Sequence, residues 1–104
     1  MPGKSNLPRE MMANFYEDFY WVYVLKSLKD GKNYTGYSKH LPSRFEAHQK
    51  GEVQSTRNRR PLEIIYVEGC LNQKDALKRE KYLKTHYGKM YLRNRLAKWF
   101  SQSE

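Results

Sequence analysis

Apolar and polar positions follow strand-like and helix-like periods in different parts of this chain. Residues 19–27, FYWVYVLKS, are aromatic and β-branched with apolar groups on both faces, which predicts a strand covered on both sides. The Asp30-Gly31 pair is a strong hairpin signal, so residues 33–38, NYTGYS, are expected to run back antiparallel. Residues 62–69, LEIIYVEG, predict a third strand.

Three segments are expected to form helices. The first opens at Leu41 with Pro42 in its first turn, and Gly51 ends it. A longer helix should begin at Asn72 or Gln73 and run to about Tyr87, where Gly88 interrupts it, and a last helix should cover residues 89–100. The element order is therefore β-β-α-β-α-α, with no internal repeat.

The length of 104 residues allows one domain. We expect a mobile leader over residues 1–18, a domain over 19–100 and a short tail over 101–104. There is no apolar run long enough for a membrane span or a convincing secretory signal. Cys70 is the single cysteine, so no internal disulfide can form, which fits a reducing cytoplasm.

The charge balance narrows the class of partner. The chain has 20 Lys and Arg against 11 Asp and Glu, a net charge of +9, and residues 74–98 hold nine basic and two acidic side chains. Such a surface suits a polyphosphate, although solvated faces of a basic protein would look the same. The sequence lacks GxxxxGK[ST], GxSxG and GxGxxG, which argues against nucleotide-triphosphate chemistry and serine hydrolysis.

Glu80 stands out because it falls on the apolar stripe of its helix, formed by Ala76, Leu77, Leu83 and Tyr87. A buried carboxylate is unfavourable unless it is paired, hydrogen-bonded or bound to a cation. Two interpretations stay open. Glu80 could form a salt bridge with an arginine such as Arg44, or it could bind a hard cation such as Mg²⁺, which often takes one or two protein carboxylates.

Arg44 and His48 are four residues apart, so they point the same way from the first helix. Arg44 suits a bidentate phosphate contact, and His48 can hydrogen-bond or donate a proton, although for His48 alone we favour a satisfied, partly buried structural histidine. Gly36 removes a side chain from its strand two residues after Tyr34. That leaves space for a phosphodiester beside this phenol, which needs a cation or arginine to act as a base.

Taken together, these segments resemble the GIY-YIG nuclease superfamily. The resemblance extends from Tyr20 to Trp99 and is closest to small single-domain bacterial members related to the nuclease module of the excision-repair incision subunit. Arg44 follows Tyr34 by ten residues and His48 follows Arg44 by four, which is part of the resemblance. The quoted motifs are VYV at 22–24, YTG at 34–36, RRPLEIIYVEG at 59–69 and ALKREKYLKT at 76–85. Gly-Ile-Tyr is replaced by Val-Tyr-Val with its tyrosine kept, and Thr35 replaces an isoleucine.

The resemblance implies an α+β fold, a three-stranded antiparallel sheet flanked by helices, and a role for each matching residue. The implied catalytic residues are Tyr23, Tyr34, Arg44, His48 and Glu80, with Glu80 as the sole carboxylate ligand of one Mg²⁺ or Mn²⁺ ion. Gly36 is the motif glycine. The expected DNA-binding residues are Gly36, Arg57, Arg59, Arg60 and Asn94.

The expected activity is divalent-metal-dependent hydrolysis of a DNA phosphodiester by in-line attack of water, in DNA repair or processing. We favour Tyr23 as the group that activates water and Tyr34 as its partner on the phosphate side. Expected partners are DNA and either a second protein or a second copy of the chain, with no nucleotide cofactor. The main alternative is a non-catalytic DNA-binding module of this fold that acts with a partner, and a weaker one is an RNA-associated protein.

Overall fold

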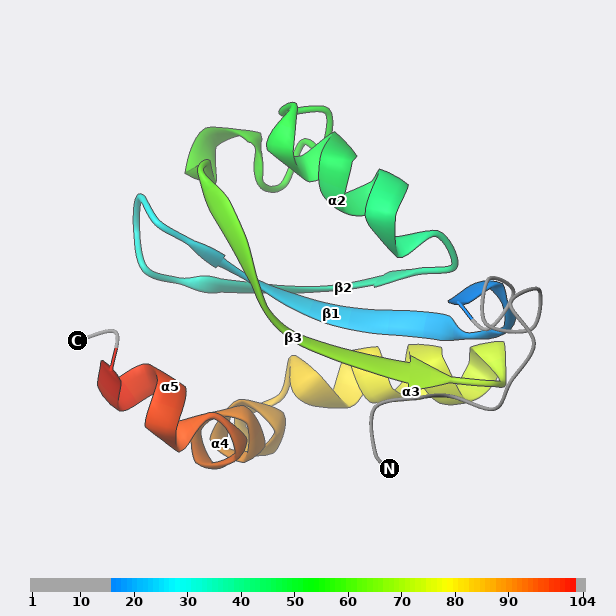
Figure 1. Cartoon of the computed structure of the whole chain (residues 1–104). Coiled ribbons are helices and arrows are strands. Elements are labelled where there is room, and N and C mark those ends of the chain that lie inside the picture. The colour runs from blue at the N-terminus through cyan, green and yellow to red at the C-terminus, as the bar shows by residue number, and fades with distance from the viewer. Residues whose placement is uncertain (1–15, 103–104) are drawn as a thin grey trace, which may run out of the picture.

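The computed structural model describes residues 16–102 as a three-stranded antiparallel sheet with helices on both faces (Figure 1). The expected α+β fold and the order of its elements are confirmed. Most of the expected leader lies outside the described residues. Its last three residues, Tyr16–Asp18, form a 3-10 turn. The Tyr16 ring packs against the Trp21 ring, with 4.9 Å between the ring centroids.

Strand β1 (Tyr20–Ser27) lies in the centre of the sheet, between β2 (Asn33–Ser38) and β3 (Leu62–Cys70), and pairs antiparallel with both. The predicted burial of both of its faces is confirmed, because all four residues from Val22 to Leu25 are fully buried. Val22 and Val24 belong to one hydrophobic cluster and Tyr23 and Leu25 to another. The two clusters lie on opposite faces, as expected for alternating side chains.

The predicted turn at Asp30-Gly31 is present. Gly31 has φ +73°, a conformation that favours glycine, and its amide donates to the Ser27 carbonyl at 2.9 Å. A register shift between β1 and β3 follows Val24, which is typical of a β-bulge and increases the local twist.

Helix α2 (Leu41–Gln49) covers one face of the sheet and α3 (Gln73–Leu83) covers the other (Figure 1). Both begin where the sequence predicts. Pro42 lies in the first turn of α2, and Gly51 follows its end with φ +79°. Asn72 caps α3 by accepting a hydrogen bond from the Lys74 amide at 2.8 Å.

The C-terminal helices differ from the prediction. The long helix expected to reach Tyr87 ends at Leu83, and α4 (His86–Arg95) begins two residues before the glycine that was expected to interrupt it. Thr85 causes the break, because its side chain caps α4 by accepting from the Gly88 amide at 3.1 Å. The single helix expected over residues 89–100 is divided at Leu96 into α4 and α5 (Ala97–Gln102).

The apolar stripe expected on α3 was partly wrong. Ala76 and Leu83 are buried, whereas Leu77 and Tyr87 are exposed, and Tyr87 lies beyond the end of the helix. The early end of α3 rotates the residues that follow away from the sheet. None of the helices found between residues 16 and 102 has the length and apolar character needed to cross a membrane.

Gly88 has a packing role rather than a helix-breaking one. It is buried, and a Cβ atom at this position would overlap the Tyr82 carbonyl oxygen and the Leu83 Cα atom. Backbone atoms cannot move aside as the end of a long side chain can. The absence of a side chain at residue 88 therefore allows α4 to approach the end of α3.

We expect Gly88→Ala to destabilise the protein by about 1–3 kcal/mol through overpacking. Helix propensity alone predicts that Gly88→Ala stabilises the protein, since alanine is favoured over glycine in a helix by about 1 kcal/mol. The measurement is the urea unfolding midpoint followed by tryptophan fluorescence. Arg95→Ala, an exposed change in the same helix, is the control and should stay within about 0.5 kcal/mol. If Gly88→Ala were more stable than the unmodified protein, the close contact between residue 88 and the end of α3 would be wrong.

Candidate active site

The side chain of Tyr23 crosses the neighbouring strand at Gly36. The two residues are paired in the β1–β2 register, and a Cβ atom at Gly36 would overlap the phenol ring and hydroxyl of Tyr23. The sequence suggested that Gly36 leaves space for a phosphodiester. In the structure the Tyr23 ring fills that space, so the glycine first serves to let this ring pass over β2.

The Tyr23 hydroxyl begins a buried chain of hydrogen bonds. It lies 2.8 Å from His48 Nε2, and His48 Nδ1 lies 2.7 Å from Thr56 Oγ1. All three side chains are buried. Burial, reinforced by the positive charge of Arg44, lowers the pKa of His48 to about 4. The imidazole is therefore neutral at pH 7, and one ring nitrogen donates while the other accepts.

Arg44 is exposed and lies one turn before His48 on α2, whose buried side is formed by Leu41, Phe45 and His48. Its guanidinium lies near the hydroxyls of Tyr23 and Tyr34, and the attraction to the Tyr23 oxygen is the main cause that raises the pKa of Arg44. Burial raises the pKa of Tyr23, and the hydrogen bond from Arg44 opposes that rise. Arg44 thus joins both motif tyrosines with one fixed positive charge.

Glu80 lies on α3, which covers the opposite face of the sheet from α2 (Figure 1). Its charge is close enough to Tyr23 to contribute to the raised pKa of that phenol. The side chain is 20% exposed, and its carboxylate pairs with Lys84 at 3.2 Å, one turn along α3. The partner is therefore Lys84 rather than Arg44. Because the pair is partly solvated, it leaves the carboxylate open to another cation.

The two motif tyrosines differ in access. Tyr23 has 0% of its surface exposed, whereas Tyr34 is half-buried and lines an open cleft beside the site. Their rings lie 6.5 Å apart between centroids, and the Tyr34 ring packs edge-on to His48 at 5.2 Å. This burial argues against the expectation that Tyr23 meets the attacking water. Tyr34 is the motif phenol that solvent and substrate can reach.

The arginine-rich segment, residues 57–60, packs against the β1–β2 hairpin, and two of its arginines interact with nearby residues. A 3-10 turn, Arg57–Arg59, follows α2, and Arg59 pairs with Asp30 at 3.0 Å. Arg60 donates to the Arg57 carbonyl at 2.9 Å and packs over Gly51. In the part of the chain that the structure describes, no salt bridge forms at Arg57. Of the three arginines expected to bind DNA, Arg57 therefore has the least competing interaction.

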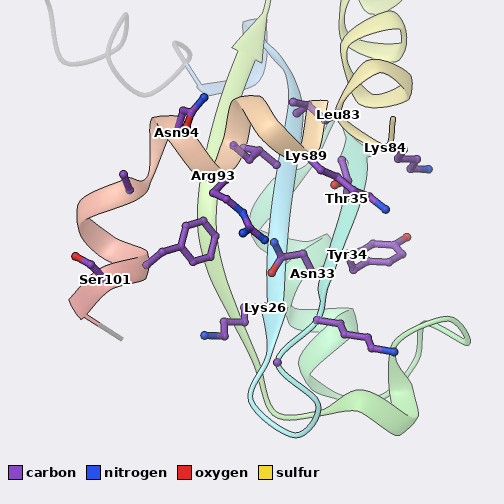
Figure 2. A pocket seen from close by; sticks show the side chains of 15 residues that line it. Lys26, Asn33, Tyr34, Thr35, Leu83, Lys84, Lys89, Arg93, Asn94 and Ser101 are labelled. Atoms are coloured by element: carbon purple, nitrogen blue, oxygen red, sulfur yellow. The ribbon is translucent and has the colours of Figure 1, made fainter. Parts of the chain in front are cut away.

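Asn94 lies on α4, away from the tyrosine cluster. It lines the same cleft as Tyr34, but its amide points away from the middle of the cleft, whereas the neighbouring Arg93 points toward Asn33 (Figure 2). Asn94 therefore belongs to the wall of the cleft, and its expected role in DNA binding stays a prediction.

Sequence reasoning missed Thr56 and Lys84. Thr56 lies in the irregular segment between α2 and β3, and it is fully buried against His48. No periodic pattern marks a single threonine in an irregular segment. The i,i+4 spacing of Lys84 from Glu80 was the signal that could have identified this ion pair.

The possible metal donors near the tyrosines are few. Between residues 16 and 102 no three His, Cys, Asp or Glu side chains gather into a metal-binding group. Glu80 is the carboxylate beside the tyrosines. A single carboxylate is consistent with Mg²⁺, which usually keeps several waters and shares its shell with substrate phosphate oxygens.

Comparisons with known proteins agree with this geometry. Residues 19–102 match the family described as the GIY-YIG catalytic domain. The chain is 39% identical over 77 residues to a UPF0213 protein of Staphylococcus aureus strain Mu3, and equally to that of strain N315. Each alignment covers 73% of this chain and 93% of the relative. No solved structure matches the chain significantly.

The low pKa of His48 predicts a specific dependence of stability on pH. The unfolded imidazole, with an ordinary pKa near 6.5, binds a proton before the folded one, whose pKa is about 4. Stability should therefore be complete above about pH 6.5 and fall as the pH drops toward 4, by at most roughly 3 kcal/mol. NMR titration of the His48 ring and urea unfolding at several pH values measure the two quantities.

His48→Gln should flatten this part of the pH profile, and His86→Gln, at an exposed histidine, should leave it unchanged. A His48 ring that titrates near pH 6.5 in the folded protein would contradict the buried neutral imidazole.

Proposed function

Because the chain belongs to the GIY-YIG family, we propose that it is a divalent-metal-dependent DNA endonuclease that hydrolyses a phosphodiester by in-line attack of water. One observation carries the proposal. Residues of β1, β2, α2 and α3 supply two tyrosines, an arginine, a histidine and a carboxylate near one another, in a protein with net charge +9. A protein that only binds DNA gains nothing from a carboxylate inside a basic site.

Arg44 is the group best suited to the scissile phosphate. It is exposed, permanently charged and close to two phenol oxygens, so a phosphate that binds beside the motif tyrosines can reach its guanidinium. Hydrolysis places additional negative charge on the non-bridging oxygens of the phosphate. A preorganised guanidinium stabilises that charge more in the transition state than in the ground state, which is the requirement for catalysis.

The two tyrosines have separate roles in this proposal. Tyr34 reaches solvent and contacts the attacking water, and Arg44 beside it stabilises negative charge on the phenol oxygen. Tyr23 acts from behind as a positioning residue, since its hydroxyl holds Arg44 on one side and His48 on the other. Thr56 fixes the orientation of the His48 ring in turn.

Glu80 would hold the metal ion, Mg²⁺ or Mn²⁺. A cation bound there would neutralise charge on the phosphate and on the leaving oxygen. Without it, the Glu80 carboxylate keeps Lys84 close to the site. We place the activity in DNA repair or processing in the cytoplasm. A non-catalytic DNA-binding module that acts with a partner protein or a second copy is the competing proposal.

Removing either charged group should nearly abolish cleavage. We expect Glu80→Gln and Arg44→Lys each to lower the cleavage rate about 10²–10³-fold, because Glu80→Gln removes the metal ligand and Arg44→Lys removes the planar bidentate contact. The assay uses nicked, flapped, branched and plain duplex DNA with Mg²⁺, Mn²⁺ or EDTA.

Glu46→Gln is the matched control, since Glu46 forms an i,i+4 pair with Lys50 at 2.8 Å away from the site. It should keep full activity. Metal-independent binding with no products from the unmodified protein would favour the binding module, and full activity in both site variants would rule out the proposed mechanism.

The difference in access between the tyrosines gives a second test. Tyr34→Phe should reduce the cleavage rate more than Tyr23→Phe, because the accessible phenol contacts the reacting water. Tyr23→Phe removes the hydroxyl bonded to His48, so it should also change the His48 ring signals in NMR spectra, whereas Tyr34→Phe leaves that bond in place. The opposite order of rates would return water activation to Tyr23.

A further inference from the structure

A cleft of about 970 Å³ lies between the β1–β2 hairpin and the two C-terminal helices (Figure 2). Its volume is at the upper end of the range for ligand pockets in proteins, about 300–1,000 Å³. The hairpin supplies Lys26 and residues 31–35, the end of α3 contributes two residues, and α4 and α5 form the opposite wall. No role for this cleft follows from the catalytic cluster.

The cleft is lined by positive charge without compensating carboxylates. Five basic side chains line it, namely Lys26, Lys32, Lys84, Lys89 and Arg93, and there is no acidic residue in its lining. Lys84 pairs with Glu80, while within residues 16–102 no salt bridge forms at the other four. Unneutralised cations on facing walls attract a polyanion strongly and focus its approach.

Apolar surface lies among these cations. Leu83 and Leu92, which belong to the core, reach the wall of the cleft, and Phe100 lines it from α5. Lys26 extends over the ring of Trp99 at 5.2 Å from its centroid, which brings a second aromatic residue next to the cleft. Phosphates would meet the lysines and Arg93, whereas the apolar surface requires a flat, weakly polar partner such as a nucleobase.

The cleft is continuous with the candidate active site. Tyr34 lines its edge, and Lys84 both lines it and pairs with the Glu80 carboxylate. Figure 2 shows Asn33 and Arg93 pointing toward each other between the hairpin and α4, with Tyr34 on the other side of β2. A chain whose phosphate is bound at Arg44 and Tyr34 can therefore continue over the edge of β2 into the cleft.

We propose that this cleft binds a single-stranded segment of DNA that is continuous with the strand to be cut. The inference rests on the proposed endonuclease function and adds the substrate class, a DNA with an unpaired strand next to the cleavage point. A duplex presents only its phosphates to a protein wall and keeps its base faces stacked, so it leaves the apolar surface of the cleft unused. An unpaired strand uses the cations and the aromatic residues together.

Binding can be measured apart from cleavage. We would use Glu80→Gln protein in EDTA and fluorescence anisotropy with three labelled DNAs: a single strand, a blunt duplex, and the same duplex with a single-stranded overhang. The single strand and the overhang should bind at least about tenfold more tightly than the blunt duplex, a difference that one stacked base can supply.

Two variants test the lining, each with a control. Lys89→Gln with Arg93→Gln should weaken binding of the overhang DNA and reduce its salt dependence by about 0.7 in slope for each lost phosphate contact. Arg95→Gln with Lys98→Gln removes the same charge from α4 and α5 outside the cleft lining and should have a smaller effect. Phe100→Leu should weaken overhang binding about fivefold or more and leave duplex binding unchanged.

The outcomes separate the two proposals. Blunt duplex bound as tightly as the overhang, or equal weakening by the two double variants, would overturn the cleft as a single-strand site. If the binding pattern holds but the unmodified protein cuts no DNA with metal, the cleft proposal stands and the endonuclease proposal is wrong. If cleavage occurs and binding ignores the cleft variants, the reverse conclusion follows.

Discussion

The burial of β1 on both faces is the constraint on which the rest of this structure depends. Four consecutive side chains, Val22 to Leu25, have no exposed surface, so the strand needs a helix layer on each side and a paired strand at each edge. Side chains alternate along the strand, so the valines point toward α3 and α4 on one face and Tyr23 points toward α2 on the other. The same strand therefore holds the fold together and fixes the position of one motif tyrosine.

Local signals in the sequence predicted most of the fold because they act over a few residues. Asp30-Gly31 marked the hairpin turn, Asn72 and Gly51 marked helix ends, and the aromatic run marked the central strand. The C-terminal helices were misjudged because two signals competed: Thr85 provides a hydrogen-bonding cap, whereas Gly88 only has a low helix propensity. The buried position of Gly88 depends on how two helices meet, which no local pattern contains.

The sequence predicted which residues belong to the candidate site better than how they are arranged. Spacing placed Arg44 and His48 on one helix face, and the structure brings both to the tyrosines. Sequence could not show that Tyr23 is sealed from solvent, because that depends on Gly36 of the next strand and on His48 of a helix. It also could not show that Thr56 supports His48, since a threonine in an irregular segment carries no periodicity. Contacts between distant segments are visible only in the folded chain.

The tight contact at Gly88 has a consequence for how far apart the two regions of the molecule can be. Helix α3 carries Glu80 and α4 carries Arg93. The backbones of the two helices meet so closely at Gly88 that no larger residue fits there, so the corner between them is tightly packed. The carboxylate and the cationic cleft are thus parts of one rigid frame. If DNA occupies both, this corner sets the number of nucleotides between the bond that is broken and the first base held in the cleft.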